Sequence, residues 1–171
     1  MKLWQALALP AAALAIGCTG GSPPSDNAKA GAISLVGAWR GSVQFQTGAF
    51  AAVKDLDFMY VFNSGGTLTE SSNYDAAPPV PPAYGIWRQT GPREFAAKYA
   101  FYATRPPAAF EEIAKGGGWM PAGHGVLQET ITLSADGRSF TSTIHYDAFD
   151  AAGKATETGT VASVHAERMG L

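Results

Sequence analysis

The sequence predicts an all-β protein whose eight strands form an antiparallel up-and-down β-barrel. From residue 36 onward, apolar and polar side chains alternate with a period of two, which is typical of strands with one buried face. Turn residues separate the alternating runs at short intervals, so successive strands are expected to pair as hairpins. Closing the sheet into a barrel also removes its edge strands. The alternative is a β-sandwich of two four-stranded sheets.

The eight strands are expected where the alternation is strongest. In the second, Phe58 and Tyr60 share one face while Asp57 lies on the other. In the fifth, Tyr99 and Phe101 lie opposite Lys98 in the same way. The predicted strands cover residues 37–46, 53–63, 66–74, 84–90, 94–103, 125–134, 138–149 and 154–166.

Three turns determine the register, because a slip of one residue would turn every side chain of a strand to the other face. The dipeptide Asp136-Gly137 predicts a two-residue hairpin loop. A three-residue loop with a left-handed Gly66 precedes the third strand, and a glycine turn at Gly153 precedes the eighth. The pairs expected from these loops are Leu133 with Phe140, Phe62 with Leu68, and Ile144 with Thr160.

Two segments interrupt the alternation. Residues 75–83 are rich in proline, which cannot donate to a sheet ladder, and are expected to form a loop. Residues 104–124 form a longer excursion, in which two prolines and three glycines delimit one short helix over residues 108–115. A loop of this length with its own helix is more often a lid or a rim than a neutral connector.

The N-terminal segment predicts export. Residues 1–17 have a basic start, a short uncharged apolar run and a small-residue end, as in a secretory signal peptide. Residues 14–18, Leu-Ala-Ile-Gly-Cys, resemble the lipobox of bacterial lipoproteins, and the resemblance implies that Cys18 becomes the lipidated first residue. The alternative is an ordinary secreted protein with an incidental cysteine. The single cysteine excludes an intramolecular disulfide.

The expected domain organisation and location follow from this segment. Residues 18–34 comprise the lipidated cysteine and a disordered tether of Gly, Pro, Ser and Ala, and residues 35–171 form the barrel. By the same resemblance, Thr19 implies the periplasmic face of the outer membrane in a two-membrane cell. We expect the lipid anchor to be the only membrane contact. The 12 Lys and Arg residues are scattered singly and the net charge is −2, so no nucleic-acid partner is expected.

The start of the first strand carries a family resemblance. Gly37-Ala38-Trp39 resembles the Gly-x-Trp signature of lipocalins and related calycin barrels. The resemblance implies that Trp39 closes the base of the barrel and that an arginine near the end of the chain, here Arg168, packs on it. In lipocalins the main helix follows the eighth strand, whereas here the helical excursion follows the fifth. The pattern Gly-x-Trp-Arg recurs at residues 85–88, through duplicated packing geometry or by chance.

The inward phase of the strands is rich in aromatic residues and provides candidate ligand contacts. An eight-stranded barrel either is filled by its own side chains or holds one small ligand. The long excursion, which would cap one end, and Gly41 and Gly159, which would leave space in the wall, favour a pocket. The candidate ligand-binding residues are Phe58, Tyr60, Trp87, Tyr99, Phe101, Ile131, Ile144 and Tyr146.

Two carboxylates also fall in the inward phase, Glu70 and Glu129. Desolvation in an apolar barrel raises the pKa of such a group, which suits a general acid or base. The alternative is that each lies in water at the barrel mouth or is hydrogen-bonded to a tyrosine as part of the structure. Because the third and sixth strands lie far apart around a barrel, the two carboxylates need not work together.

No metal or cofactor is expected. His145 and His165 fall in the outward phase, far apart along their strands, and His124 lies in a loop. Neither a phosphate-binding glycine loop nor a serine nucleophile elbow occurs.

The leading functional hypothesis is a lipid-anchored extracytoplasmic barrel that binds a small apolar or amphipathic molecule without catalysis. The first alternative, by analogy of fold alone, is an enzyme of isomerase, cyclase or dehydratase type that uses Glu70 or Glu129. The second alternative is a non-catalytic scaffold or envelope-interaction domain with a filled barrel.

Overall fold

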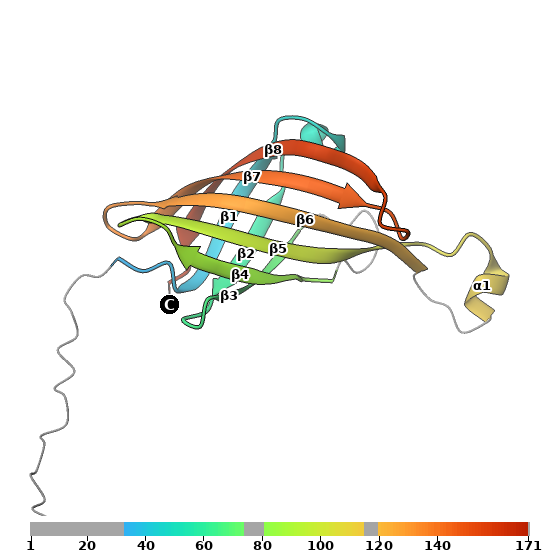
Figure 1. Cartoon of the computed structure of the whole chain (residues 1–171), viewed down its shortest axis with the longest axis horizontal. Helices are drawn as coiled ribbons and strands as arrows, with labels where there is room; N and C mark the ends of the chain where they lie inside the picture. The colour runs from blue at the N-terminus through green and yellow to red at the C-terminus, as the bar shows by residue number, and fades with distance from the viewer. Residues whose placement is uncertain (1–32, 74–80, 115–119, 171) are drawn as a thin grey trace, which may run out of the picture. The chain divides into compact units, whose positions relative to one another are not determined.

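The computed structural model describes residues 33–73, 81–114 and 120–170. Eight antiparallel strands form a closed barrel in which each strand pairs with the next and the last pairs with the first (Figure 1). This confirms the predicted fold class, and the β-sandwich alternative is wrong. The strands are β1 (Gly37–Phe45), β2 (Asp57–Phe62), β3 (Thr67–Ser72), β4 (Ala83–Gln89), β5 (Glu94–Arg105), β6 (Met120–Leu133), β7 (Ser139–Phe149) and β8 (Ala155–Arg168).

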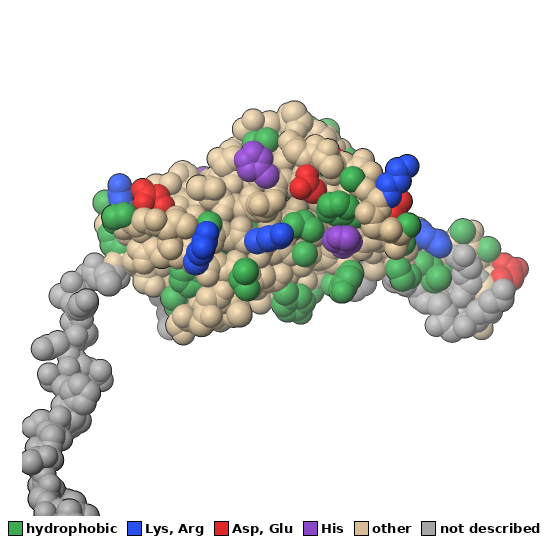
Figure 2. Space-filling view, viewed as in Figure 1, with side chains coloured by type: hydrophobic (Ala, Val, Ile, Leu, Met, Phe, Trp, Pro, Cys, Tyr) green, Lys and Arg blue, Asp and Glu red, His purple; other side chains and the backbone are tan. Residues whose placement is uncertain are grey.

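The N-terminal predictions lie outside the described residues. These predictions are the signal peptide, lipidation at Cys18 and all of the tether except its last two residues. Within the described ranges, no helix is long and apolar enough to cross a membrane. On the visible face of the barrel, basic and acidic side chains are interspersed and form no large patch of one sign (Figure 2).

The second strand is shorter than predicted, because a side-chain contact takes the place of strand pairing at its expected start. A 3-10 turn, η1 (Ala49–Ala52), follows β1. The side chain of Asn73 then donates to the carbonyl of Asp55 and accepts from the backbone N–H of Asp57, each at 2.8 Å. This side chain satisfies backbone groups that strand pairing would otherwise use. β2 therefore begins at Asp57 and not at residue 53.

The long excursion is shorter than predicted. β5 runs to Arg105 and β6 begins at Met120, with one register shift between Ala103 and Thr104. The expected helix is present as α1 (Phe110–Ala114), inside the predicted range. Phe110 is 76% exposed, so the first residue of α1 does not pack on the barrel.

Two of the three predicted registers are confirmed. Leu133 pairs with Phe140 and Phe62 pairs with Leu68. The turn at Asp136-Gly137 nevertheless differs from the predicted two-residue loop, because the Gly137 N–H donates to the Ser134 carbonyl. Ala135 and Asp136 are therefore the central residues, and Gly137 follows them with a φ of 69°.

The predicted register of β7 and β8 is wrong by two residues. Ile144 pairs with Ala162 and not with Thr160, because the ladder shifts twice between Tyr146 and Phe149. Gly159 has a φ of 68° and donates its N–H to the side chain of Asp147, which holds this irregularity. A shift of two residues preserves the face of every side chain, so the inward phase remains as predicted.

One end of the barrel is closed as the resemblance implies. Trp39 is fully buried and its ring lies 5.1 Å from that of Phe140. The guanidinium carbon of Arg168 lies 4.1 Å from the centroid of the Trp39 ring. The same guanidinium donates to the backbone carbonyls of Ser34, Val36 and Gly137. Arg168 thus stabilises this end through both a cation–π contact and hydrogen bonds.

The second Gly-x-Trp-Arg segment packs at the same end. A Cβ at Gly85 would collide with the backbone of β5, so this glycine permits close strand approach. The half-buried Trp87 ring lies 5.9 Å from that of Phe62, which in turn lies 6.3 Å from Phe140. Trp39 and Trp87 therefore belong to one aromatic cluster that fills the closed end.

Candidate functional site

A pocket opens at the other end of the barrel. Along β1 the chain runs from the closed end at Trp39 to the pocket at Phe45, and along β5 it runs from Phe95 to Phe101. The cavity volume is about 80 Å³. Its walls are formed by Phe45, Phe50, Leu56, Phe58, Glu70, Ser71, Ser72, Pro81, Phe101, Leu127 and Tyr146.

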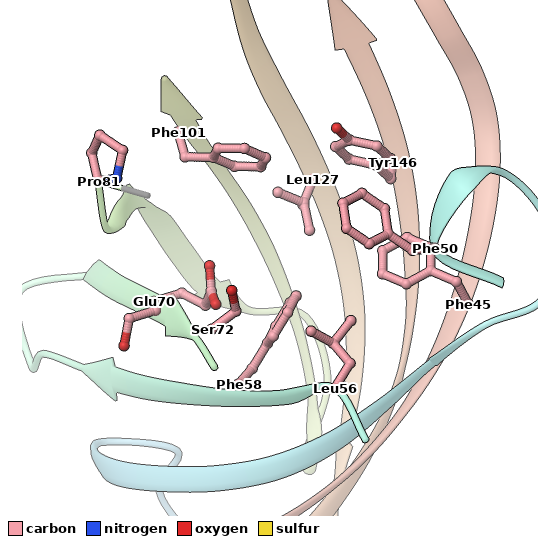
Figure 3. Close-up of a pocket in the computed structure, with 11 residues that line it drawn as sticks. Phe45, Phe50, Leu56, Phe58, Glu70, Ser72, Pro81, Phe101, Leu127 and Tyr146 are labelled. Carbon is pink, nitrogen blue, oxygen red and sulfur yellow. The ribbon is translucent and has the colours of Figure 1, made fainter. Parts of the chain in front are cut away.

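Five of the eleven wall residues are aromatic, and most of their rings gather on one side of the pocket (Figure 3). Phe101 and Tyr146 are stacked with centroids 6.3 Å apart. Gly125 of β6 gives both rings room, because a Cβ at this position would collide with them. Phe50, carried by η1, lies 5.5 Å from Phe45 and 6.4 Å from Tyr146. Contacts of this kind hold aromatic rings in fixed orientations, so the wall is preorganised.

The opposite wall carries a carboxyl group. Glu70 is 5% exposed, and Figure 3 places it beside Ser72, across the pocket from Phe50 and Tyr146. Its Oε1 has no hydrogen-bond partner among the described residues. Burial, and next the charge of Glu129, raise the pKa of Glu70 to about 8. The group is therefore mostly protonated at neutral pH in the empty pocket.

Glu129 lies one step nearer the closed end and is 2% exposed. Tyr99 donates a hydrogen bond of 2.8 Å to its Oε2, and Ser142 donates a short one to its Oε1. Burial raises the pKa of Glu129 to about 7, although the two donors act in the opposite direction. The charge of Glu129 also contributes to the raised pKa of Glu70, so the two carboxylates interact although β3 and β6 lie apart around the barrel.

Tyr60 completes a polar layer beneath the pocket. It pairs with Glu70 across β2 and β3, and its ring lies 6.4 Å from that of Tyr99. Its hydroxyl is buried and has no hydrogen-bond partner among the described residues. Burial, together with the charges of Glu129 and Glu70, raises the pKa of Tyr60 well above its ordinary value. The hydroxyl of Tyr99 acts on the pKa of Tyr60 in the opposite direction, so Glu70 carries the clearest unpartnered polar atom of this region.

The predicted ligand-binding residues fall into three groups. Phe58, Phe101 and Tyr146 line the pocket, whereas Tyr60 and Tyr99 form the layer below it. The remaining three lie elsewhere, because their strand positions are nearer the closed end. These are Ile131 and Ile144, which are fully buried in the core, and Trp87, which packs at the closed end.

Sequence reasoning missed part of the wall. Phe45, Leu56 and Leu127 belong to the inward phase, and their strand positions near Phe58 and Phe101 would have indicated them. Phe50 could not be predicted from the alternation of apolar and polar residues, because it lies on the 3-10 turn η1 and not on a strand.

Neither Gly41 nor Gly159 makes space in the pocket wall as expected. A Cβ at Gly41 would lie 2.7 Å from the Cβ of Ala166, so this glycine is packed against β8. Gly159 is exposed and belongs to the irregularity of β8. The glycine that makes room at the pocket is Gly125.

The site combines apolar walls with one side of acidic and hydroxyl groups. Within the described ranges, no cluster of three or more His, Cys, Asp or Glu residues has a geometry that could hold a metal ion. His145 and His165 are exposed on the outer face. No protein-family model matches the chain, and no curated protein matches it significantly. Chemically, such a pocket suits binding of a small amphipathic group or transfer of a proton.

Proposed function

We propose that this barrel binds a small amphipathic molecule, whose polar end lies at Glu70 and whose apolar part contacts the aromatic wall. The observation that carries the proposal is a preformed apolar pocket with an unpartnered, buried carboxyl oxygen at one side. Buried polar groups in proteins nearly always have hydrogen-bond partners. An unsatisfied group at a cavity therefore suggests that a ligand supplies the missing hydrogen bond. Mostly apolar walls with a few convergent polar groups are typical of binding sites.

The size of the pocket limits what enters. The pocket volume of about 80 Å³ is small for a ligand site. Pockets that enclose drug-sized ligands measure roughly 300–1,000 Å³. The proposed ligand therefore inserts its polar end and its first few carbon atoms, while the remainder extends from the mouth.

Titration with 1-octanol, followed by isothermal calorimetry and protein NMR shifts, tests this proposal. A ligand of nine heavy atoms that recovers roughly 0.6 kcal/mol per atom binds with a Kd of about 0.1 mM. Leu127→Phe fills the pocket and should weaken binding at least tenfold, whereas Met59→Phe adds a ring on the exposed outer face and should not. Absence of saturable binding, or equal binding by both variants, would refute the proposal.

The second candidate function is acid–base catalysis of isomerase, cyclase or dehydratase type. It is favoured by one observation, namely two buried carboxyls whose pKa values of about 8 and 7 lie near neutral pH. Its test is deuterium exchange at the α-carbons of small ketones in D2O. Exchange above the buffer rate that Glu70→Gln abolishes supports catalysis, and a rate equal to buffer excludes it for those substrates.

We also propose that the chain is exported and anchored through a lipid on Cys18, on the strength of the lipobox resemblance of residues 14–18. Anchoring would place the pocket outside the cytoplasm, and a two-membrane host would carry it on the periplasmic face of the outer membrane. Expression in a bacterial host with labelled palmitate is the test. Label that is incorporated by the wild type and lost in Cys18→Ser supports the anchor, and an unlabelled wild type refutes it.

A further inference from the structure

We propose that the pocket selects ligands whose polar end is a protonated amine, which enters first and pairs with an ionised Glu70. This inference rests on the binding function proposed above and names the chemical class of the ligand. It depends on three features: the unpartnered oxygen of Glu70, the sign of the charges that face it, and the aromatic wall opposite.

The first feature is hydrogen-bonding capacity. An ammonium group has three donors and no acceptor. One donor can pair with the carboxyl of Glu70, which lines the pocket, and the hydroxyl of Ser72 lies next to this carboxyl on the same wall (Figure 3). A hydrogen bond between a charged donor and a carboxylate is about twice as strong as a neutral one. Glu70 and Ser72 therefore offer acceptors for two of the three donors of an ammonium, and Glu70 also offers the opposite charge.

The second feature is the sign of the electrostatic potential. The titratable groups that act on Glu70 and its neighbours are Glu129 from β6, Tyr60 from β2 and Tyr99 from β5, all of which are neutral or negative. None of the described residues that line the pocket is Lys, Arg or His. A cation would thus be attracted by Glu70 and Glu129 together. A carboxylate of the same shape would meet two acidic groups and no positive partner.

The third feature is the ring-rich wall. Phe58, Phe101 and Tyr146, with Phe45 and Phe50, surround the cavity. Aromatic faces attract cations, most strongly where water is excluded. The same rings provide apolar contact for the carbon chain that follows the amine. An uncharged alcohol would keep the apolar contacts and lose the charge interactions.

Three probes of equal chain length separate these contributions: 1-octylamine, 1-octanol and octanoate. At pH 7, calorimetry on the folded protein should give an amine affinity at least tenfold above that of octanol, with octanoate weaker than both. Equal binding of amine and alcohol, or preference for octanoate, overturns the inference while the proposed binding function stands. If none of the probes binds, the proposed function fails as well.

A second readout tests the pairing directly. Because Glu70 is mostly protonated in the empty pocket, binding of an ammonium should release close to one proton at pH 7. Comparing binding enthalpies in buffers of different ionisation heat measures this number. Octanol should release none, and amine binding without proton release contradicts the pairing.

Variants complete the design. Glu70→Gln keeps the shape of the side chain, and should abolish both the preference for octylamine over octanol and the proton release. Glu167→Gln removes an exposed carboxylate from the outer face of β8, so it controls for the change in net charge and should behave as wild type. An unchanged amine preference in Glu70→Gln overturns the assignment.

Discussion

Glu70 should make the folded protein less stable as the pH rises, and Glu70→Gln should remove the part of this dependence that Glu70 contributes. The carboxyl has an ordinary pKa of 4.5 in the unfolded chain and a pKa of about 8 in the folded barrel. Linkage converts this difference into a loss of about 3 kcal/mol in the free energy of unfolding between pH 5 and pH 8. Such a loss is a large fraction of the stability of a typical domain.

The sign follows from proton binding. Between pH 4.5 and about 8 the folded state holds the Glu70 proton and the unfolded state has lost it, so raising the pH favours unfolding. Glutamine has no proton to lose. Any cost of burying its amide is the same at every pH and cancels when the two pH values are compared.

Urea unfolding at pH 5, 6, 7 and 8, followed by circular dichroism, measures the effect. The free energy of unfolding of Glu70→Gln relative to wild type should increase by about 3 kcal/mol from pH 5 to pH 8. Glu167→Gln, which alters an exposed carboxylate, should follow the wild type across this range. If wild type and Glu70→Gln change in parallel with pH, Glu70 is not a buried acid with a raised pKa, and the argument for its role in the pocket fails.

Three further changes test other parts of the structure by urea unfolding. Gly41→Ala places a Cβ 2.7 Å from that of Ala166 and should cost about 1–3 kcal/mol; an unchanged midpoint would contradict this packing. Arg168→Lys loses the planar contact with Trp39 and part of its hydrogen-bond fork, and should cost about 1–2 kcal/mol, whereas equal stability would deny that role. Ser142→Ala removes a donor to Glu129, so its pKa should rise above about 7 and stability at pH 8 should fall more than at pH 5; a uniform loss would refute this.

The fold was predictable because its pattern is local. Alternation identifies the inward face of each strand, and that face depends only on odd or even position, so it survived the two-residue error between β7 and β8. The sequence could not predict where a side chain forms the hydrogen bonds that the backbone of a neighbouring strand would otherwise form. Asn73 shortens β2, and Asp147 with Gly159 shifts β8, through contacts between residues distant in sequence.

The site was predictable in type but not in depth along the barrel. Periodicity places a residue inside the barrel without saying at which end, so Phe58 and Phe101 were grouped with Trp87, which packs at the closed end. The depth follows from register and strand tilt, which the three turns fix only partly. The electrostatic interaction between Glu70 and Glu129 could not be predicted either. Strands that are separated around the wall can still bring long side chains together across a narrow interior.

The two ends of the barrel use similar side chains with opposite consequences for stability. At the closed end, aromatic rings fill the interior and Arg168 covers Trp39, so every contact favours folding. At the open end, rings surround a space, and Glu70 beside it costs stability at neutral pH because its charged form is disfavoured. A leucine at position 70 would fill part of that space without this cost. A destabilising group in a cavity is better explained by what it binds than by what it stabilises, which is the physical reason for our proposal that Glu70 and its surroundings form a binding site.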